Sequence, residues 1–390
     1  MKALTWHGTR DVRVEEVPDP VLQDPTDAVV RITSTGLCGS DLHLYEPLGA
    51  FLTPGDVLGH EPMGVVEEVG AGVHDLKVGQ RVVVPFNVSC GTCFTCSAGL
   101  HSQCETTQNR EHGTGASLFG YTKLYGQVPG GQAEYLRVPF ADTLPVPVPD
   151  GPADDRFVYL SDVLPTAWQA VEYAGVQPGD TLVVVGLGPI GDMAARIALH
   201  RGVEVIGIDL EPARLARARG RGVTALMLDD DVVETVQGLT DGRGPHAVVD
   251  AVGLEAHGSP AAGVAQKASR LLPDALAEKM MRKAGVDKLH ALQLAIDLVR
   301  RGGTLSLSGV YAGAADPLPL FTMFDKQLTV RMGQANVHRW VDDILPLLTD
   351  EDPLGVDDFA THHLPLADAP QAYADFQAKD DGMVKVLFRP

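Results

Sequence analysis

Residues 181–209 read TLVVVGLGPIGDMAARIALHRGVEVIGID, and they are the first guide to the fold. An apolar run over 182–185 predicts a buried strand that ends directly in a glycine-rich turn. In that turn Gly186 permits the tight bend, and Gly188 leaves room for the backbone to approach a pyrophosphate. Gly191 lets the next helix lie close to the sheet. The order of these features predicts a dinucleotide-binding βαβ unit.

The rest of this unit supplies the helix, a second strand and an acidic residue. Pro189 and Ile190 open the helix, where proline's missing N–H is not needed, and the helix ends near Gly202. A second buried strand follows over 203–208 and ends in Asp209, placed to accept hydrogen bonds from an adenosine ribose. Asp209 would repel a 2′-phosphate and no arginine follows it immediately, so the sequence favours NAD over NADP.

Strands and helices continue to alternate after this unit, which predicts a doubly wound parallel sheet of six strands. The connection between the fourth and fifth strands is unusually long, and its first part, 254–285, is predicted to be a functional flap or an interface element. The apolar stripe from Val286 to Val299 in the same connection predicts an amphipathic helix. The four further predicted strands are Val223 to Leu228, Ala247 to Val252, Thr304 to Leu307 and Gln327 to Met332.

The first 150 residues predict a mainly antiparallel β domain whose segments are separated by Gly and Pro, with no helical period. The proline-dense LPVPVPDGP at 144–152 marks its end. The tail 334–390 is expected to pack back onto this domain, with a helix near Trp340 to Leu348 and a final strand. The clearest strands are Ala28 to Thr33, Gly64 to Val69, Arg81 to Val84 and, in the tail, Val384 to Phe388.

Length, composition and charge limit which classes of protein this chain can belong to. At 390 residues, 45% hydrophobic and 21% charged, the chain is an ordinary globular protein with room for two domains. A formal charge of −20 argues against nucleic acid and anionic membranes as partners. The start MKALTWHG lacks the apolar core of a signal peptide, and no apolar run is long enough to cross a bilayer. We therefore expect a cytoplasmic protein.

Four of the five cysteines, Cys90, Cys93, Cys96 and Cys104, lie within fifteen residues. Four thiolates close around one tetrahedral ion and leave no open position, which predicts a structural zinc site. An iron–sulfur cluster is the chemical alternative, but the spacing fits the ferredoxin patterns poorly. A nucleic-acid-binding zinc ribbon is the other alternative, and the absence of Lys and Arg between Cys90 and Cys104 argues against it.

A second group of candidate ligands surrounds the remaining cysteine in CGSDLH, on the first loop of the β domain. Cys38 and His60 supply a thiolate and an imidazole, although a buried free cysteine and a core histidine are the simpler interpretation. Asp41 is placed to accept the other ring proton of His60. Ser40 and His43 provide the hydroxyl and the imidazole that a proton relay to solvent requires.

One acidic residue stands alone in LSDVLPT, the turn that leads into the nucleotide-binding part. Taken by itself, Asp162 reads as a helix N-cap. It is also the only carboxylate in an apolar and hydroxyl-bearing turn, so a ligand role stays open.

Together the glycine fingerprint, the cysteine lobe, CGSDLH, GHE and LSDVLPT make the chain resemble the zinc-containing medium-chain alcohol dehydrogenases, especially their formaldehyde dehydrogenase and dismutase branch. The resemblance covers essentially the whole length. It implies an α/β protein with a GroES-like β-rich catalytic domain over 1–160 and 334–390, including a structural-zinc lobe at 86–106. A Rossmann NAD-binding domain would occupy 161–333.

The resemblance also implies roles for individual residues. A catalytic zinc would be bound by Cys38, His60 and Asp162, the last replacing a cysteine found in many members, and we expect this harder donor to make the zinc more electrophilic. Relatives imply two zinc ions per chain, NAD, and a dimer or tetramer. The remaining roles are Glu61 beside the metal, Ser40 and His43 as the proton relay, Asp41 as the partner of His60, Thr166 near the nicotinamide, and Phe86 as a wall of the substrate pocket.

The expected reaction is hydride transfer between a small alcohol or aldehyde, of the formaldehyde type, and NAD. A polyol or secondary-alcohol dehydrogenase is the alternative within the enzymes. A non-catalytic regulatory protein that binds NAD and zinc is the alternative outside them, although such a protein needs no proton relay. In the formaldehyde branch an extra loop accompanies tightly held cofactor, so the segment 254–285 raises the same expectation here.

Overall fold

The computed structural model describes residues 1–46, 48–252, 289–309, 311, 318–349, 351–379 and 382–390. The predicted flap at 254–285 lies outside these residues. The chain divides into two compact units, Met1–Thr166 with Ala335–Pro390, and Ala167–Gln334. The division falls within helix α4 (Val163–Ala174).

The second unit is built on a parallel sheet of six strands in the order β11-β10-β9-β12-β13-β14. The strand order runs outward from β9 on both sides, to β10 and β11 on one side and to β12, β13 and β14 on the other. This makes the sheet doubly wound and confirms the predicted fold class. All six predicted strands are present, with ends that differ by up to two residues. They are β9 (Thr181–Val185), β10 (Glu204–Asp209), β11 (Thr224–Met227), β12 (Ala247–Asp250), β13 (Thr304–Leu307) and β14 (Thr329–Met332).

Helices cover both faces of this sheet. Val183 and Val185 of β9 pack in one core with α7 and α10, while the intervening Val184 faces the start of α5. Successive residues of a strand point to opposite faces, so this continuously apolar strand is buried on both sides. The described helices of this unit are α5 (Pro189–His200), α6 (Pro212–Arg219), α7 (Val232–Leu239), α10 (His290–Leu298) and α11 (Leu320–Asp325).

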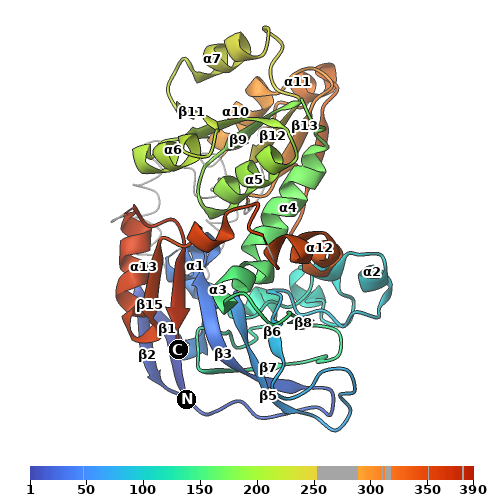
Figure 1. Ribbon diagram of the computed structural model, residues 1–390, viewed down its shortest axis with the longest axis vertical. Coiled ribbons are helices and arrows are strands. Elements are labelled where there is room, and N and C mark those ends of the chain that lie inside the picture. Colours follow the sequence, from blue (N-terminus) through green and yellow to red (C-terminus); the bar gives the residue numbers. More distant parts are fainter. Residues whose placement is uncertain (47, 253–288, 310, 312–317, 350, 380–381) are drawn as a thin grey trace. The chain divides into compact units, whose positions relative to one another are not determined.

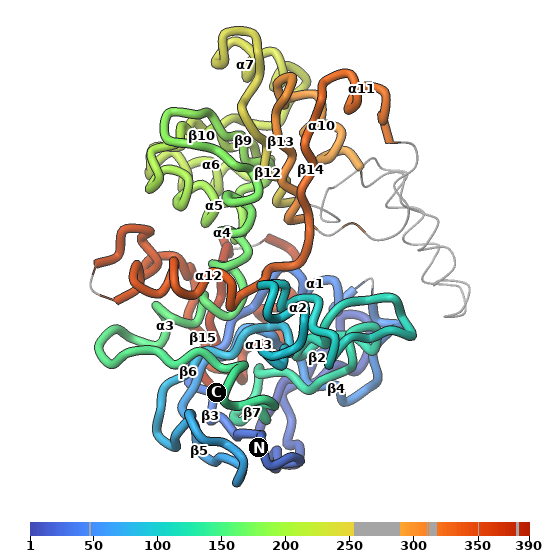
Figure 2. The backbone as a smooth tube through the Cα atoms, turned by 90° about the vertical axis from the view of Figure 1, so that its right-hand side faces the viewer, coloured from blue at the N-terminus to red at the C-terminus, as the bar shows by residue number. Residues whose placement is uncertain are grey.

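The first unit is mainly antiparallel, as the sequence predicts. Strands far apart in sequence pair here: β16 from the C-terminus lies against β3, so the blue and red strands are neighbours in Figure 1 and the two chain ends lie close together in Figure 2. The strands are β1 (Lys2–Gly8), β2 (Asp11–Glu16), β3 (Ala28–Leu37), β4 (Asp56–Val57), β5 (Pro62–Val69), β6 (Arg81–Val83), β7 (Tyr135–Val138), β8 (Val146–Pro147), β15 (His362–Pro365) and β16 (Val386–Arg389).

The expectation of a β domain without helices in its first 150 residues was wrong at one important place. The CGSDLH motif does not lie on a loop: it begins helix α1 (Gly39–Tyr45), and Leu44 of this helix is fully buried. A helix of seven residues is too short to display a recognisable period in the sequence. The other helices of this unit are α2 (Phe94–Ser97), α3 (Asp154–Phe157), α12 (Val337–Ile344) and α13 (Ala369–Ala378). No helix among the described residues is both long and apolar enough to cross a membrane.

Candidate active site

The start of α1 explains why cysteine and aspartate stand three residues apart. Cys38 precedes the helix, and its backbone N–H donates to Asp41 Oδ2 at 3.0 Å. Asp41 is the third helical residue, a position where a carboxylate satisfies a free N–H and interacts favourably with the helix dipole. This local structure fixes the direction of both side chains.

His60 lies between Asp41 and the remaining candidate ligands. Its Nδ1 is 3.1 Å from Asp41 Oδ1, while its Nε2 is 3.3 Å from Asp162 Oδ2 and 3.2 Å from Ser40 Oγ. The ring therefore faces a fixed carboxylate on one side and the candidate ligands on the other. A carboxylate on the far nitrogen is the usual arrangement that orients a metal-binding histidine.

Asp162 follows a turn of 3-10 helix (Val158–Ser161) and immediately precedes α4. Its Oδ2 is 3.7 Å from Cys38 Sγ, whereas its Oδ1 accepts a hydrogen bond of 2.7 Å from Thr166 Oγ1, one helical turn later. Thr166 is predicted to lie near the nicotinamide. The structure shows its hydroxyl bound to Asp162, a contact that the sequence analysis missed.

Glu61 comes next to His60 in sequence, and its carboxylate forms an ion pair with Lys385 of the C-terminal segment. Lys385 Nζ also donates to the carbonyl of Leu37 at 3.1 Å. Both charged side chains are buried, with exposures of 1% for Glu61 and 0% for Lys385. Glu61 Oε1, by contrast, has no hydrogen-bond partner within the part of the chain that the structure describes.

These side chains fit a bound metal ion. One potential ligand atom from each of Cys38, His60, Glu61 and Asp162 lies within 4.8 Å of the others. Burial, with the neighbouring Glu61 and Asp162, raises the pKa of the Cys38 thiol. Burial would lower the pKa of His60, but Asp41 and Asp162 outweigh it and raise the pKa well above its usual value. A cation at this point would compensate the crowded carboxylates, and thiolate, imidazole and carboxylate are all zinc ligands.

One other predicted residue, Phe86, lies near this cluster, and His43 lies on the same helix as Ser40. The ring of Phe86 approaches the ring of His60 edge-on, with 6.4 Å between their centroids, which is compatible with a pocket wall beside the metal site. His43 lies on α1 one turn after Gly39, and its backbone carbonyl accepts a hydrogen bond from Leu48 N–H. The structure thus brings Ser40 against His60 and keeps His43 on the same short helix.

The four remaining cysteines converge in the same unit. Cys93 Sγ and Cys104 Sγ are 3.9 Å apart, close to the roughly 3.8 Å that tetrahedral zinc with bonds of about 2.3 Å requires. Burial would raise the pKa of Cys93, but hydrogen bonds from Thr95 and from the backbone outweigh it and lower the pKa to about 5. Burial would also raise the pKa of Cys90, but hydrogen bonds outweigh it and lower the pKa, whereas burial and the neighbouring cysteines raise the pKa of Cys96. The four sulfur atoms lie within 4.8 Å of one another, which is the grouping that a structural zinc site requires.

The glycine-rich turn of the second unit has the predicted backbone. Gly186 has φ +85°, which only glycine adopts readily, and a Cβ on Gly191 would lie 1.8 Å from the carbonyl oxygen of Gly186. Gly188 precedes α5, and Pro189 and Ile190 form its first turn. That these residues bind a dinucleotide stays a prediction, now supported by the local geometry.

Asp209 ends β10, and both of its carboxylate oxygens accept backbone hydrogen bonds. The donors are Leu187 N–H at 2.6 Å and Glu211 N–H at 2.8 Å. Arg214 Nη1 lies 3.6 Å from Asp209 Oδ2, and 3.5 Å from the point where a Cβ on Gly188 would be. An arginine therefore does stand beside this carboxylate, five residues along the chain, which weakens one of the two grounds for choosing NAD over NADP.

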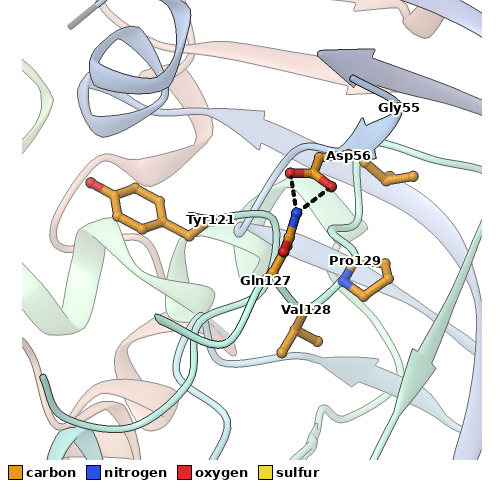
Figure 3. Close-up of a pocket in the computed structure, with 7 residues that line it drawn as sticks. Gly55, Asp56, Tyr121, Gln127, Val128 and Pro129 are labelled. Atoms are coloured by element: carbon orange, nitrogen blue, oxygen red, sulfur yellow. Dashed lines mark hydrogen bonds between the residues drawn. The ribbon is translucent and has the colours of Figure 1, made fainter. Parts of the chain in front are cut away.

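A small surface pocket lies elsewhere in the first unit, where 55–57 meet 127–129 (Figure 3). Gln127 Nε2 bridges both oxygens of Asp56, each at 2.9 Å, while the ring of Tyr121 lies on the other side, away from that pair. None of the residues that line it is a predicted site residue, so the pocket does not mark the candidate metal site.

Two of the residues described above were missed by the sequence analysis for different reasons. Arg214 follows Asp209 by five residues, so a scan of the whole first turn of the next helix would have found it. Lys385 lies 324 positions from its partner Glu61, and no spacing rule connects a lysine just before the last strand with a glutamate that follows His60. Only the pairing of β16 with β3 brings the two together.

Comparisons with known proteins agree with this arrangement. Residues 24–149 match the family model for the alcohol dehydrogenase GroES-like domain, and residues 189–273 match the model for zinc-binding dehydrogenases. A zinc-type alcohol dehydrogenase-like protein of Bacillus subtilis is 37% identical, with all of both chains covered. A glutathione-independent formaldehyde dehydrogenase of Pseudomonas aeruginosa is 33% identical over 97% of this chain and 95% of its own.

Solved structures support the same relationship over the whole fold. The alcohol dehydrogenase TADH from Thermus sp. ATN1 superposes with a TM-score of 0.83 at 35% identity, covering 100% of this chain and 99% of its own. Both parts of the chain, the β-rich part and the nucleotide-binding part, are thus shared with these relatives. The chain belongs to the zinc-dependent medium-chain alcohol dehydrogenase family.

Proposed function

We propose that the protein is an NAD-dependent zinc enzyme that oxidises small alcohols or aldehydes of the formaldehyde type. The observation that carries this proposal is the convergence of Cys38 Sγ, His60 Nε2 and Asp162 Oδ2 beside the hydroxyl of Ser40. Family membership supports an oxidoreductase acting on small alcohols or aldehydes. The formaldehyde type is supported by the relative named for that activity and by Asp162 in the place of a cysteine.

In this proposal Cys38, His60 and Asp162 bind a catalytic zinc, and the four lobe cysteines bind a structural one. Bound zinc supplies Lewis-acid chemistry by polarising the oxygen of an alcohol or aldehyde. Ser40 accepts the proton of the substrate hydroxyl, which belongs to the alcohol or to the hydrate that an aldehyde forms with water, and His43 passes it to solvent. Asp41 keeps the ring of His60 in place through Nδ1, so that Nε2 stays directed to the metal.

NAD would bind over the turn formed by Gly186, Gly188 and Gly191 and the first residues of α5, Pro189 and Ile190. It supplies the hydride acceptor, and the N-terminus of α5 would bind its pyrophosphate. Asp209 would contact the adenosine ribose, with Arg214 at the rim of the same site. The resemblance puts Thr166, whose hydroxyl contacts Asp162, near the nicotinamide.

We further propose that the protein is a cytoplasmic homo-oligomer, a dimer or tetramer. The support is an exposed sheet edge in the second unit: β14 is exposed along its whole length, with Val330 39% and Met332 61% exposed. Phe321 and Phe324 on the neighbouring α11 are each 82% exposed. A monomer seldom leaves such an edge and such side chains uncovered.

The proposal is tested by following NADH formation with a panel of substrates, including formaldehyde, primary alcohols, secondary alcohols and polyols. We expect turnover of formaldehyde or small primary alcohols with NAD, and loss of turnover in Cys38→Ser and His60→Ala. The exposed His74 supplies the control, since His74→Ala should retain activity. Turnover of polyols or secondary alcohols alone would show that the protein is a polyol or secondary-alcohol dehydrogenase instead. Absence of turnover from protein with zinc bound would favour a regulatory protein.

A further inference from the structure

Gln132 is a buried amide that lies behind the candidate metal site, outside every motif that the sequence analysis singled out. Its exposed fraction is 0%, and it lies in the segment that enters β7. A buried amide has to find partners for its two N–H donors and its oxygen inside the protein. The partners of Gln132 therefore show what this side chain does.

The hydrogen bonds of this amide determine which way it points. Its Nε2 donates to the carbonyl of Gly36 at 3.0 Å and, over a longer 3.4 Å, to Asp41 Oδ2. A carbonyl and an ionised carboxylate only accept, so the NH2 group and not the oxygen faces them. On the other side Oε1 accepts a 2.8 Å hydrogen bond from the hydroxyl of Tyr373 in α13.

Tyr373 is suited to donate to this oxygen. Its side chain is fully buried, and its ring meets the ring of Tyr45 edge-on, with 5.6 Å between their centroids. Burial, together with the nearby Asp41, raises the pKa of Tyr373 well above its usual value, so the hydroxyl keeps the proton that it donates. The phenol satisfies the amide oxygen, and both amide protons remain for Gly36 and Asp41.

Asp41 in turn faces donors on both of its oxygens. Oδ2 accepts from the Cys38 N–H at 3.0 Å and from Gln132, while Oδ1 lies 3.1 Å from His60 Nδ1. Because an ionised carboxylate only accepts, this arrangement requires a proton on Nδ1 of the imidazole. Nε2, which faces Asp162, is then the nitrogen that offers a lone pair to a metal ion.

The backbone of Gln132 holds the segment that carries His60. Its N–H donates to the carbonyl of Leu58 at 3.0 Å. Gly59 has φ +95°, and a Cβ at this position would lie 2.4 Å from Cγ of Gln132, so the chain passes directly against that side chain. One residue thus contacts both Asp41 and the segment that carries its partner His60.

We propose that Gln132 is a positioning residue for the catalytic metal: its amide holds Asp41 and its backbone holds the segment of His60, so that Nε2 stays directed to the metal. Tyr373 acts one step further out, through the oxygen of the same amide. The inference rests on the proposed metal site, and Gln132 touches neither metal nor substrate in it. Without the amide, Asp41 Oδ2 keeps only the Cys38 N–H, and the carboxylate orients the imidazole less firmly.

The cobalt(II) affinity of the catalytic site, measured by chelator competition in protein whose four-cysteine lobe retains zinc, tests this inference. Gln132→Leu should lower this affinity about 3- to 10-fold, less than the loss of a ligand's direct partner, because it acts one layer further out. Gln169 supplies the matched control, since it is 3% exposed and its amide donates to two backbone carbonyls. Gln169→Leu should lower stability and leave the cobalt affinity unchanged.

Double variants show whether Gln132 acts through Asp41. In an Asp41→Ala background, Gln132→Leu should change the cobalt affinity less than about twofold, because the group that the amide holds is gone. Tyr373→Phe should likewise add nothing once Gln132→Leu is present. Losses of affinity that multiply in either double variant would overturn the inference, as would a Gln132→Leu protein with parent affinity.

The Nδ1 proton of His60 gives a second readout, which loss of stability alone would not explain. In the cobalt protein its proton resonance is shifted by the paramagnetic ion and disappears as the proton exchanges with D2O. Exchange should be about threefold faster or more in Gln132→Leu and in Tyr373→Phe, and unchanged in Gln169→Leu.

Tyr373→Phe alone covers the case in which Gln132→Leu fails to fold, because it removes a single oxygen atom. The parent exchange rate in Tyr373→Phe would overturn the inference. If the parent protein itself binds no cobalt outside the four-cysteine lobe, the proposed function fails instead.

Discussion

Asp41 shows how one side chain can serve both the backbone and a candidate ligand. Its two oxygens contact Cys38 N–H and His60 Nδ1, so it orients two of the three proposed zinc ligands. We predict that Asp41→Asn lowers zinc affinity about 10- to 100-fold, measured by chelator competition, with a parallel loss of turnover. The neutral amide can still accept the helix hydrogen bond but no longer attracts the imidazole N–H as strongly.

Asp142 provides the matched control for this change, because it too accepts backbone hydrogen bonds, from His74, Asp75 and Leu76. Asp142→Asn should lower stability modestly and leave zinc affinity unchanged. Equal metal affinity in Asp41→Asn and the parent would show that Asp41 is only a helix cap.

Cofactor choice also depends on single residues. With Asp209 replaced by Ser, the repulsion of a 2′-phosphate disappears while Arg214 remains beside the site. We predict that Asp209→Ser raises the ratio of kcat/KM with NADP to that with NAD at least tenfold. Adding Arg214→Ser should reverse most of this gain. If Asp209→Ser leaves the ratio unchanged, Asp209 does not determine the choice between NAD and NADP.

At the scale of elements, the contact between β9 and α5 depends on a glycine. A Cβ on Gly191 would overlap the Gly186 carbonyl, so Gly191→Ala must push the helix from the strand. We predict a loss of about 1–3 kcal/mol in the free energy of unfolding, measured with denaturant. Gly238, exposed in α7 with no atom near its missing Cβ, is the control, because Gly238→Ala should stabilise by about 0.5–1 kcal/mol.

The α12 helix carries a half-buried histidine that links stability to pH. Burial lowers the pKa of His338, whose Nε2–H donates to the Leu144 carbonyl at 2.8 Å, and burial together with His338 lowers the pKa of His101 to about 4. The folded protein keeps these rings neutral while the unfolded chain protonates them below about pH 6.5. Stability should therefore be full above that pH and decline as the pH falls towards 4.

Thermal unfolding across this range tests the prediction. The decline should be smaller in His338→Gln, because one of the two depressed groups is gone. His74→Gln, a change at an exposed histidine, should reproduce the decline of the parent. If the stability of His338→Gln falls with pH as much as that of the parent, the pH dependence arises from other groups.

Across the whole molecule, the parts that were predictable from sequence are those specified by local pattern. The six parallel strands follow from apolar runs and the glycine turn, and the cysteine lobe follows from spacing over fifteen residues. Helix α1 was missed because seven residues do not show a period, although its Cys38 and Asp41 are cap residues. Lys385 was missed because its role depends on the pairing of two strands from opposite ends of the chain.

The proposed chemistry requires that this chain hold two metal ions on two separate sets of side chains, one of them catalytic. The most direct measurement is metal analysis of the parent and of Cys38→Ser, with Cys93→Ser as the matched change in the other set. We predict about two zinc ions in the parent and one in each variant, with turnover abolished specifically when Cys38 is changed. One zinc ion in both the parent and Cys38→Ser would contradict the account.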